Sequence, residues 1–153
     1  MKIATLAIIV KGNKVLLGYK KKGEIGTNTL NGPGGKCEPN ESPINCLIRE
    51  TKEELDITLD AKYLEKISVI TFFFAGVASF EVHVFRTDRF EGTPKETADM
   101  IPDWYDVNNL PLDKMLESDR EWFSKAIRGE KFNANVYYRA RASNFEKIEF
   151  LPT

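Results

Sequence analysis

The chain has 153 residues, of which 42% are hydrophobic and 29% charged, and its formal net charge is −1. This length predicts a single domain, residues 1–153, that can bury a sizeable hydrophobic core. The balanced charge argues against a nucleic-acid polymer as partner, because such polymers are bound by strongly basic surfaces.

Targeting and redox signals are sparse. The sequence has no signal-peptide pattern and no apolar run of about 18 residues. We therefore expect a soluble, cytoplasmic monomer that does not bind membranes. Cys37 and Cys46 are expected to be free thiols in a reducing compartment. A zinc site at these two cysteines is not expected, because the other ligands it needs are missing from the sequence pattern.

The first third of the chain predicts two strands followed by a loop. Residues 2–10 are almost continuously apolar, residues 11–13 suit a turn, and residues 14–20 suit a second strand. Residues 20–29 are polar and begin with three lysines, of which Lys20 is the best candidate to face a phosphate; the alternative is that all three are simply solvated. The glycine-rich residues 30–35 would let the backbone approach a ligand closely. Lys36 follows them and is a stronger phosphate candidate.

A helix with clustered glutamates is predicted from Pro43 to about Asp56. Ser42 suits the N-cap and Pro43 the first helical position. Apolar residues recur at spacings of three and four, which defines one buried face. Beside that face lie three carboxylates, within about 100° of one another: Glu50, Glu53 and Glu54. Like charges this close destabilise a helix unless a partner such as Mg²⁺ compensates them; the alternative is a merely solvated, charged face.

The second half of the chain predicts mainly strands. Residues 62–74 and 79–87 suit a strand pair around a turn, residues 88–101 a long polar loop, and residues 104–107 a short strand. A capping-box pattern at residues 118–121 predicts a second helix that ends at Gly129. Residues 131–140 and 144–150 suit a closing hairpin. His83 lies mid-strand, where we expect a structural role. This order of elements predicts an α/β class with mixed layers.

The glutamate-rich helix belongs to a longer pattern that resembles the Nudix box. Its fixed positions are Gly35, Glu41, Arg49, Glu50, Glu53, Glu54 and the apolar Ile57. A chance match has a probability on the order of 10⁻⁸ per starting position. Thr51 and Asp56 depart from the usual box, but neither is a metal-ligand position. The resemblance implies the Nudix fold, an α/β/α sandwich with a mixed central sheet, and a pyrophosphohydrolase that uses Mg²⁺, with Mn²⁺ as an alternative.

The resemblance also implies roles for the residues of the box. Glu50, Glu53 and Glu54 would ligate the metal, and the backbone carbonyl of Gly35 can join them. Arg49 would orient a catalytic glutamate, with Glu41 supporting the site. The base would be Glu50, Glu54 or a more distant loop acid, and Asp99 matches a loop acid near the metals.

Stretches outside the box resemble the MutT-like branch of the family that hydrolyses oxidised purine nucleoside triphosphates. They are residues 15–23, 30–36, 82–94 and 114–123. The positions that match its substrate pocket are Thr5, Lys20, Asn31, Phe80, Leu116, Ser118, Asp119 and Trp122. Three of these depart from the branch, because Phe80 takes the place of a pocket methionine, Leu116 that of a stacking tryptophan and Ser118 that of an aspartate. The alternative role for Ser118 is an N-cap of the second helix.

We therefore expect a Mg²⁺-dependent hydrolase that converts a purine nucleoside triphosphate, either an ordinary one or an oxidised one such as 8-oxo-dGTP, to monophosphate and pyrophosphate. One alternative is a Nudix hydrolase of another nucleoside diphosphate derivative, such as a nucleotide sugar or a dinucleotide. A second alternative is a catalytically silent nucleotide-binding module, which would typically have lost box carboxylates; here none is lost.

Overall fold

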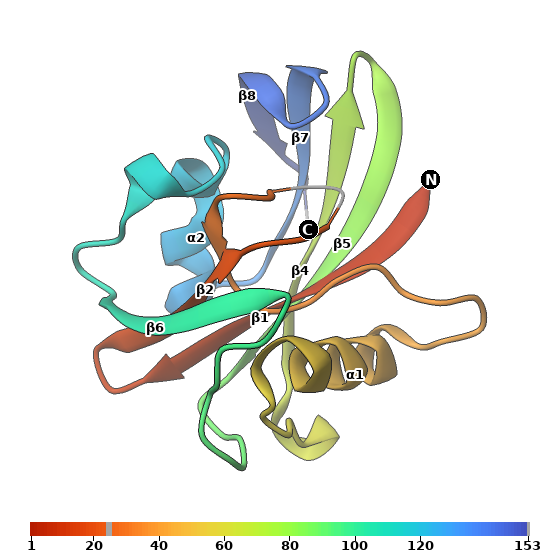
Figure 1. Ribbon diagram of the computed structural model, residues 1–153. Helices are drawn as coiled ribbons and strands as arrows, with labels where there is room; N and C mark the ends of the chain where they lie inside the picture. The colour runs from red at the N-terminus through yellow and green to blue at the C-terminus, as the bar shows by residue number, and fades with distance from the viewer. Residues whose placement is uncertain (24–25, 153) are drawn as a thin grey trace.

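The computed structural model describes residues 1–23 and 26–152, and Figure 1 shows a curled sheet with α1 and α2 on opposite sides of it. Residues 24 and 25, in the loop expected at 20–29, and residue 153 lie outside the described part. The helices are α1 (Pro43–Leu55) and α2 (Asp119–Ile127), with short 3-10 turns at Ala61–Tyr63 and Leu112–Lys114. The strands are β1 (Lys2–Lys11), β2 (Lys14–Lys20), β3 (Leu30–Asn31), β4 (Glu65–Phe74), β5 (Val77–Thr87), β6 (Met100–Asp106), β7 (Phe132–Ala140) and β8 (Ser143–Phe150).

Strand β1 lies at the middle of the sheet, which explains its nearly continuous apolar sequence. The strand order is β3-β2-β1-β5-β4-β7-β8, and β6 adds to β2. The β1–β5 and β4–β7 pairs are parallel, and the other pairs are antiparallel. A strand with neighbours on both edges and helices over both faces must be apolar on both faces. The sheet is therefore mixed, as expected.

Two hydrophobic cores lie on opposite faces of β1. Leu6 and Ile8 belong to the core that contains Trp122 and Phe123 of α2. The intervening side chains of β1, including Ile9, belong to the core that contains Leu47 and Leu55 of α1. Because successive side chains of a strand point to opposite faces, this alternation places one helix on each side of the sheet. The predicted α/β class and its layered arrangement are confirmed.

Local sequence signals fix both ends of α1. At its start the Ser42 hydroxyl accepts a hydrogen bond from the Asn45 N–H at 3.2 Å, and Pro43 occupies the first turn. At its end Asp56 adopts the left-handed conformation with φ 57°, and its N–H donates to the Lys52 carbonyl. Glycine adopts this conformation more readily, so Asp56 carries a small local cost there. The helix begins and ends where the sequence predicts.

Strand boundaries differ from prediction where a distant partner decides them. Residues 61–63 form a 3-10 turn, so β4 begins at Glu65 rather than at residue 62. β6 begins at Met100 instead of residue 104, because it pairs with β2 along its whole length. Pro102 is tolerated in this strand because β6 lies at an edge of the sheet, where a missing N–H need not break a ladder.

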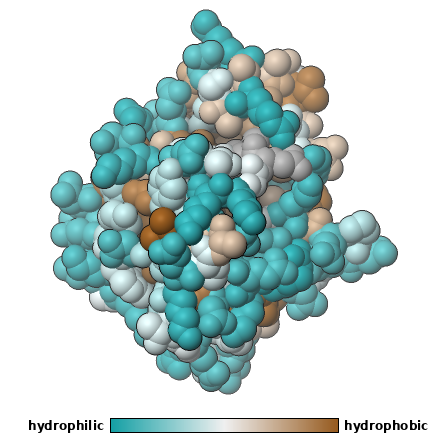
Figure 2. Space-filling model, in the orientation of Figure 1, coloured by the Kyte–Doolittle hydropathy of each residue, from teal (hydrophilic) through white to brown (hydrophobic). Residues whose placement is uncertain are grey.

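The surface in Figure 2 is mainly hydrophilic, with only small hydrophobic areas. In the described part of the chain, no helix has the length and apolar composition that a membrane span requires.

Candidate active site

Most of the predicted site residues line one cavity of about 360 Å³. They come from both ends of the chain, because β1, the loop after β3, helix α1 and the start of α2 converge on it. The predicted residues in its wall are Thr5, Lys20, Asn31, Gly35, Lys36, Glu50, Glu54, Phe80, Asp99, Leu116, Asp119 and Trp122. Glu41, Arg49, Glu53 and Ser118 do not line it. The cavity has an acidic end next to α1 and a largely apolar end next to α2.

Glu54 is the most deeply buried carboxylate at the acidic end, with 5% of its surface exposed. Its Oε1 accepts a hydrogen bond from the Gly34 N–H at 2.7 Å. Desolvation nevertheless raises the pKa of Glu54 to about 7, against the opposing effects of this hydrogen bond and of the charge on Lys20. Glu50 lies beside it, and burial raises its pKa as well. In the absence of a bound cation, the Glu54 carboxyl can therefore exchange a proton near neutral pH.

Arg49 holds the acidic residues of the box together outside the cavity. Its Nε and Nη2 donate to the two carboxylate oxygens of Glu41, each at 2.8 Å. Its Nη1 donates to Glu50 at 2.9 Å and to Glu53 at 3.4 Å. The Arg49 hydrogen bonds lower the pKa of Glu41 to about 2. A paired-oxygen contact of this kind is geometrically rigid, so Arg49 fixes the orientation of Glu50 relative to the loop that carries Glu41.

Gly35 brings the loop backbone against Glu50. A Cβ at this position would lie 2.6 Å from a carboxylate oxygen of Glu50, so a larger residue would force that carboxylate to move. The Gly35 carbonyl already accepts a hydrogen bond from the Thr5 N–H at 2.9 Å. The Thr5 hydroxyl lies 3.4 Å from the same oxygen and the Cys46 thiol 3.5 Å. The geometry therefore supports Gly35 as the residue that makes room for Glu50 more than as a metal ligand through its carbonyl.

The apolar end holds two buried polar groups that have no partner within the described residues. They are the Asp119 Oδ2 and the Trp122 Nε1. Asp119 is 2% exposed, and desolvation raises its pKa to about 7. Buried polar groups in native proteins nearly always have hydrogen-bond partners. Both residues line the cavity, so a ligand in the cavity is the natural partner for these groups.

Two aromatic residues of this wall were missed by sequence reasoning. Phe72 and Phe74 of β4 line the cavity together with the predicted Phe80. Their alternation in the strand is a signal that could have placed them on one face, but it does not say which face carries the cavity. Flat aromatic side chains of this kind suit a planar heterocycle.

Ser118 does not cap α2, so the predicted capping box is wrong. The residue is fully buried with helical φ and ψ, and its side chain makes no capping hydrogen bond. Its hydroxyl accepts from the Tyr138 hydroxyl at 2.8 Å, and its N–H donates to the same Tyr138 oxygen at 3.1 Å. The Ser118 side chain does not cap the helix because it is hydrogen-bonded to Tyr138 on β7, a partner that is distant in the sequence. Asp119 therefore faces the cavity without Ser118.

The His83 side chain is hydrogen-bonded to another side chain of its own strand, β5. Its Nε2 lies 2.8 Å from a carboxylate oxygen of Glu81, and the residue is not part of the cavity wall. This position gives it no contact with the acidic cluster.

The fold and the carboxylate cluster define a class, and comparison with known proteins agrees with it. Residues 1–126 match the family described as NUDIX domain, so the chain belongs to the Nudix family and is a hydrolase. Enzymes of this family generally use divalent metal ions and act on small-molecule nucleotides.

Two curated relatives carry the same name, oxidized purine nucleoside triphosphate hydrolase. The protein from Danio rerio is 38% identical over 132 residues, which cover 86% of this chain and 83% of the relative. The protein from Mus musculus is 33% identical over the same shares of the two chains. Among solved structures, the MutT protein from Bacillus halodurans superposes with a TM-score of 0.83 over 100% of this chain and 99% of its own, at 20% identity. That likeness confirms the fold.

Proposed function

We propose that this protein is a Mg²⁺-dependent pyrophosphohydrolase of purine nucleoside triphosphates, including oxidised ones, that yields monophosphate and pyrophosphate. One observation carries the proposal: a single cavity joins the half-buried carboxylate of Glu50 and the buried carboxylate of Glu54 to the unpartnered polar groups of Asp119 and Trp122. The first end suits a phosphate chain with its cation, and the second suits a planar base. The names of the two animal relatives support the same substrate class.

The donor set at the acidic end fits a hard divalent cation. Glu50, Glu54 and Asp99 line the cavity, and their side-chain donors are carboxylate oxygens. Glu53 lies between Glu50 and Glu54 on α1 but does not line the cavity. Oxygen ligands suit Mg²⁺, and Mn²⁺ accepts the same set. A bound cation would neutralise phosphate charge and acidify water. The burial that raises the pKa of Glu50 and Glu54 is the environment in which a cation is most stabilising.

The protein side chains divide the remaining work. Arg49 keeps Glu50 in place through its 2.9 Å hydrogen bond. We assign the base for the attacking water to Glu54, because it is the most deeply buried carboxylate in the cavity wall and lies beside Glu50. Lys20 and Lys36 line the cavity and offer positive charge to the phosphate chain. Positioning and charge neutralisation of this kind provide most of the catalysis of phosphoryl transfer.

Base selection falls to the α2 end. An Asp119 carboxyl with a pKa of about 7 can accept a hydrogen bond when ionised and donate one when neutral. The Trp122 indole N–H can donate to a ring nitrogen or carbonyl oxygen. Phe72, Phe74 and Phe80 provide apolar walls, whereas Leu116 replaces an aromatic platform and forgoes about 1–3 kcal/mol of base stacking. We expect binding of the base to be weaker here than in a pocket with a stacking tryptophan.

A substrate panel in Mg²⁺ tests the proposal. We expect kcat/KM for 8-oxo-dGTP or 2-hydroxy-dATP to exceed that for dGTP, dATP and dCTP by at least about tenfold, the effect of one good hydrogen bond. Asp119→Ala should abolish this selectivity by raising KM. Leu116→Trp should lower KM for the favoured base. Equal rates on all nucleotides, or faster hydrolysis of a nucleotide sugar or dinucleotide, would contradict the purine assignment.

The remaining expectations concern the state of the protein. We propose a monomer, since the described residues of a single chain already bring the acidic and apolar ends of the cavity together. We also propose a cytoplasmic location, which the two free cysteines support. Sedimentation velocity with and without nucleotide tests the first; a stable dimer that contributes residues to the cavity would contradict it.

A further inference from the structure

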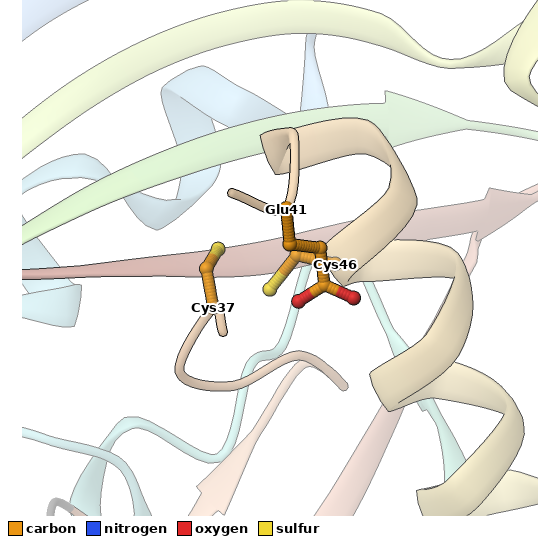
Figure 3. A group of neighbouring side chains, drawn as sticks. All are labelled: Cys37, Glu41 and Cys46. Carbon is orange, nitrogen blue, oxygen red and sulfur yellow. The ribbon is translucent and has the colours of Figure 1, made fainter. Parts of the chain in front are cut away.

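The two cysteines lie face to face next to the acidic end of the cavity, although the sequence places them nine residues apart. Figure 3 shows the side chains of Cys37 and Cys46 pointing toward the space between the loop and the start of α1, with Glu41 beside them. The two sulfurs and a carboxylate oxygen of Glu41 all lie within 4.8 Å of one another. Cys37 is partly exposed, whereas Cys46 is fully buried.

Such a group could hold a thiophilic metal ion or form a disulfide, and the hydrogen bonds of Glu41 favour the disulfide. Both carboxylate oxygens of Glu41 are taken by Arg49, each at 2.8 Å. A metal ion would have to displace that pair and would still have only three protein ligands, whereas a structural zinc site uses four. Without Glu41, the two thiols remain as the reactive partners.

The backbone holds both cysteines in place. The Cys37 N–H donates to the Ile3 carbonyl of β1 at 2.9 Å, which ties the loop to the sheet. The Cys46 N–H donates to the Ser42 carbonyl at 2.9 Å, in the first turn of α1. Because both main-chain segments are fixed, the two sulfurs stay within 4.8 Å of each other. A disulfide requires them to close to about 2 Å.

We propose that Cys37 and Cys46 form a reversible intramolecular disulfide when the protein meets a peroxide. In the first step the more exposed Cys37 sulfur attacks one peroxide oxygen; the O–O bond breaks, the other oxygen leaves as water, and Cys37 becomes a sulfenic acid. In the second step the Cys46 sulfur attacks the Cys37 sulfur, the S–O bond breaks and water leaves. Two thiols and one hydrogen peroxide thus give one disulfide and two waters, and an external thiol reverses the reaction.

Burial raises the pKa of both thiols, so this pair should react more slowly than an activated catalytic cysteine. The proximity of the two sulfurs determines which product forms, and it does not make the reaction with peroxide fast. The bridge would connect the loop that carries Gly35 and Glu41 to the helix that carries the metal-binding glutamates. It would also remove the Cys46 S–H that lies 3.5 Å from the Gly35 carbonyl.

Mass spectrometry of the folded protein tests the proposal. The protein is treated with hydrogen peroxide, denatured, alkylated and weighed intact, then cut after Glu38 or Glu41, which lie between the two cysteines. We expect neither cysteine to be alkylated, and the intact mass to be two hydrogens below that of the reduced, unalkylated protein. The peptides that contain Cys37 and Cys46 should stay joined until a reductant is added. Cys37→Ser is the matched control, and it should lose no hydrogens.

Several outcomes would overturn the disulfide. One is full alkylation of both cysteines after a peroxide treatment that oxidises surface methionines. Peroxide could add oxygen to one cysteine and leave the other reduced, or link two chains to each other. Retention of one zinc ion per chain after dialysis, with both thiols protected from peroxide, would assign the group to a metal instead. None of these readouts depends on the substrate, so the result stands apart from the proposed activity.

Discussion

Replacing Asp119 with asparagine should change how the stability of the protein depends on pH. Asp119 is 2% exposed, and desolvation raises its pKa from 3.8 to about 7. The folded state therefore binds this proton more tightly than the unfolded chain does. The resulting stability is fully present below about pH 4 and is lost as the pH rises through about 7. Asparagine has nearly the same shape and does not ionise, so the variant lacks this term.

The expected size follows from the shift itself. About three pKa units correspond to about 4 kcal/mol over the whole range, of which about 3 kcal/mol falls between about pH 5 and pH 8. Relative to wild type, the free energy of unfolding of Asp119→Asn should therefore rise by about 3 kcal/mol between these two pH values. Glu54, whose pKa is also raised, is present in both proteins, so its contribution cancels in the comparison.

Urea denaturation of both proteins at the two pH values measures this difference. Asp113→Asn is the matched control, because it removes one carboxylate from an exposed position. If the free energies of unfolding of wild type and Asp119→Asn change by the same amount between the two pH values, the pKa of the buried carboxyl is not raised in the folded protein. The account of base recognition through a carboxyl that is neutral near pH 7 would then fall.

Three further substitutions probe the site. Arg49→Lys should lower kcat by about 10²-fold or more with little change in KM, because a lysine cannot make the two-oxygen contact with Glu41; steady-state kinetics measures this. Tyr138→Phe should lower the free energy of unfolding by about 1–3 kcal/mol in urea titrations, since it leaves buried groups at the start of α2 unpartnered. Gly35→Ala puts a Cβ 2.6 Å from a carboxylate oxygen of Glu50, so the Mg²⁺ concentration needed for half-maximal rate should rise, whereas unchanged metal dependence would count against the role given to this glycine.

The sequence predicted the helix that carries the clustered glutamates well, because the information for this helix is local. The Ser42 cap, Pro43 and the apolar spacing define the helix on which the glutamates lie, and that helix appears with the expected ends. The close approach of the loop backbone to Glu50 follows from the absence of a side chain at Gly35. These features depend on neighbours within about two turns of a helix, so reading them requires no knowledge of the fold.

Features that depend on distant partners were missed. Ser118 has the local sequence pattern of a helix cap, yet its hydroxyl is hydrogen-bonded to Tyr138, which lies 20 residues further along the chain. The first residues of β6 form a strand only because β2 pairs with them. The approach of Cys37 to Cys46 depends on how the loop passes between β1 and α1, which the spacing of two cysteines does not reveal. In each case a tertiary contact overrides or completes a local preference.

Product analysis tests the central claim most directly. Purified protein is incubated with 8-oxo-dGTP, with Mg²⁺ or with a chelator, and the nucleotide and phosphate products are separated and quantified. We predict equal amounts of nucleoside monophosphate and pyrophosphate, formation only with the cation, and a loss of about 10²-fold or more in rate for Glu54→Gln. Release of inorganic phosphate with a diphosphate, or undiminished turnover by the chelated protein or by Glu54→Gln, would contradict it.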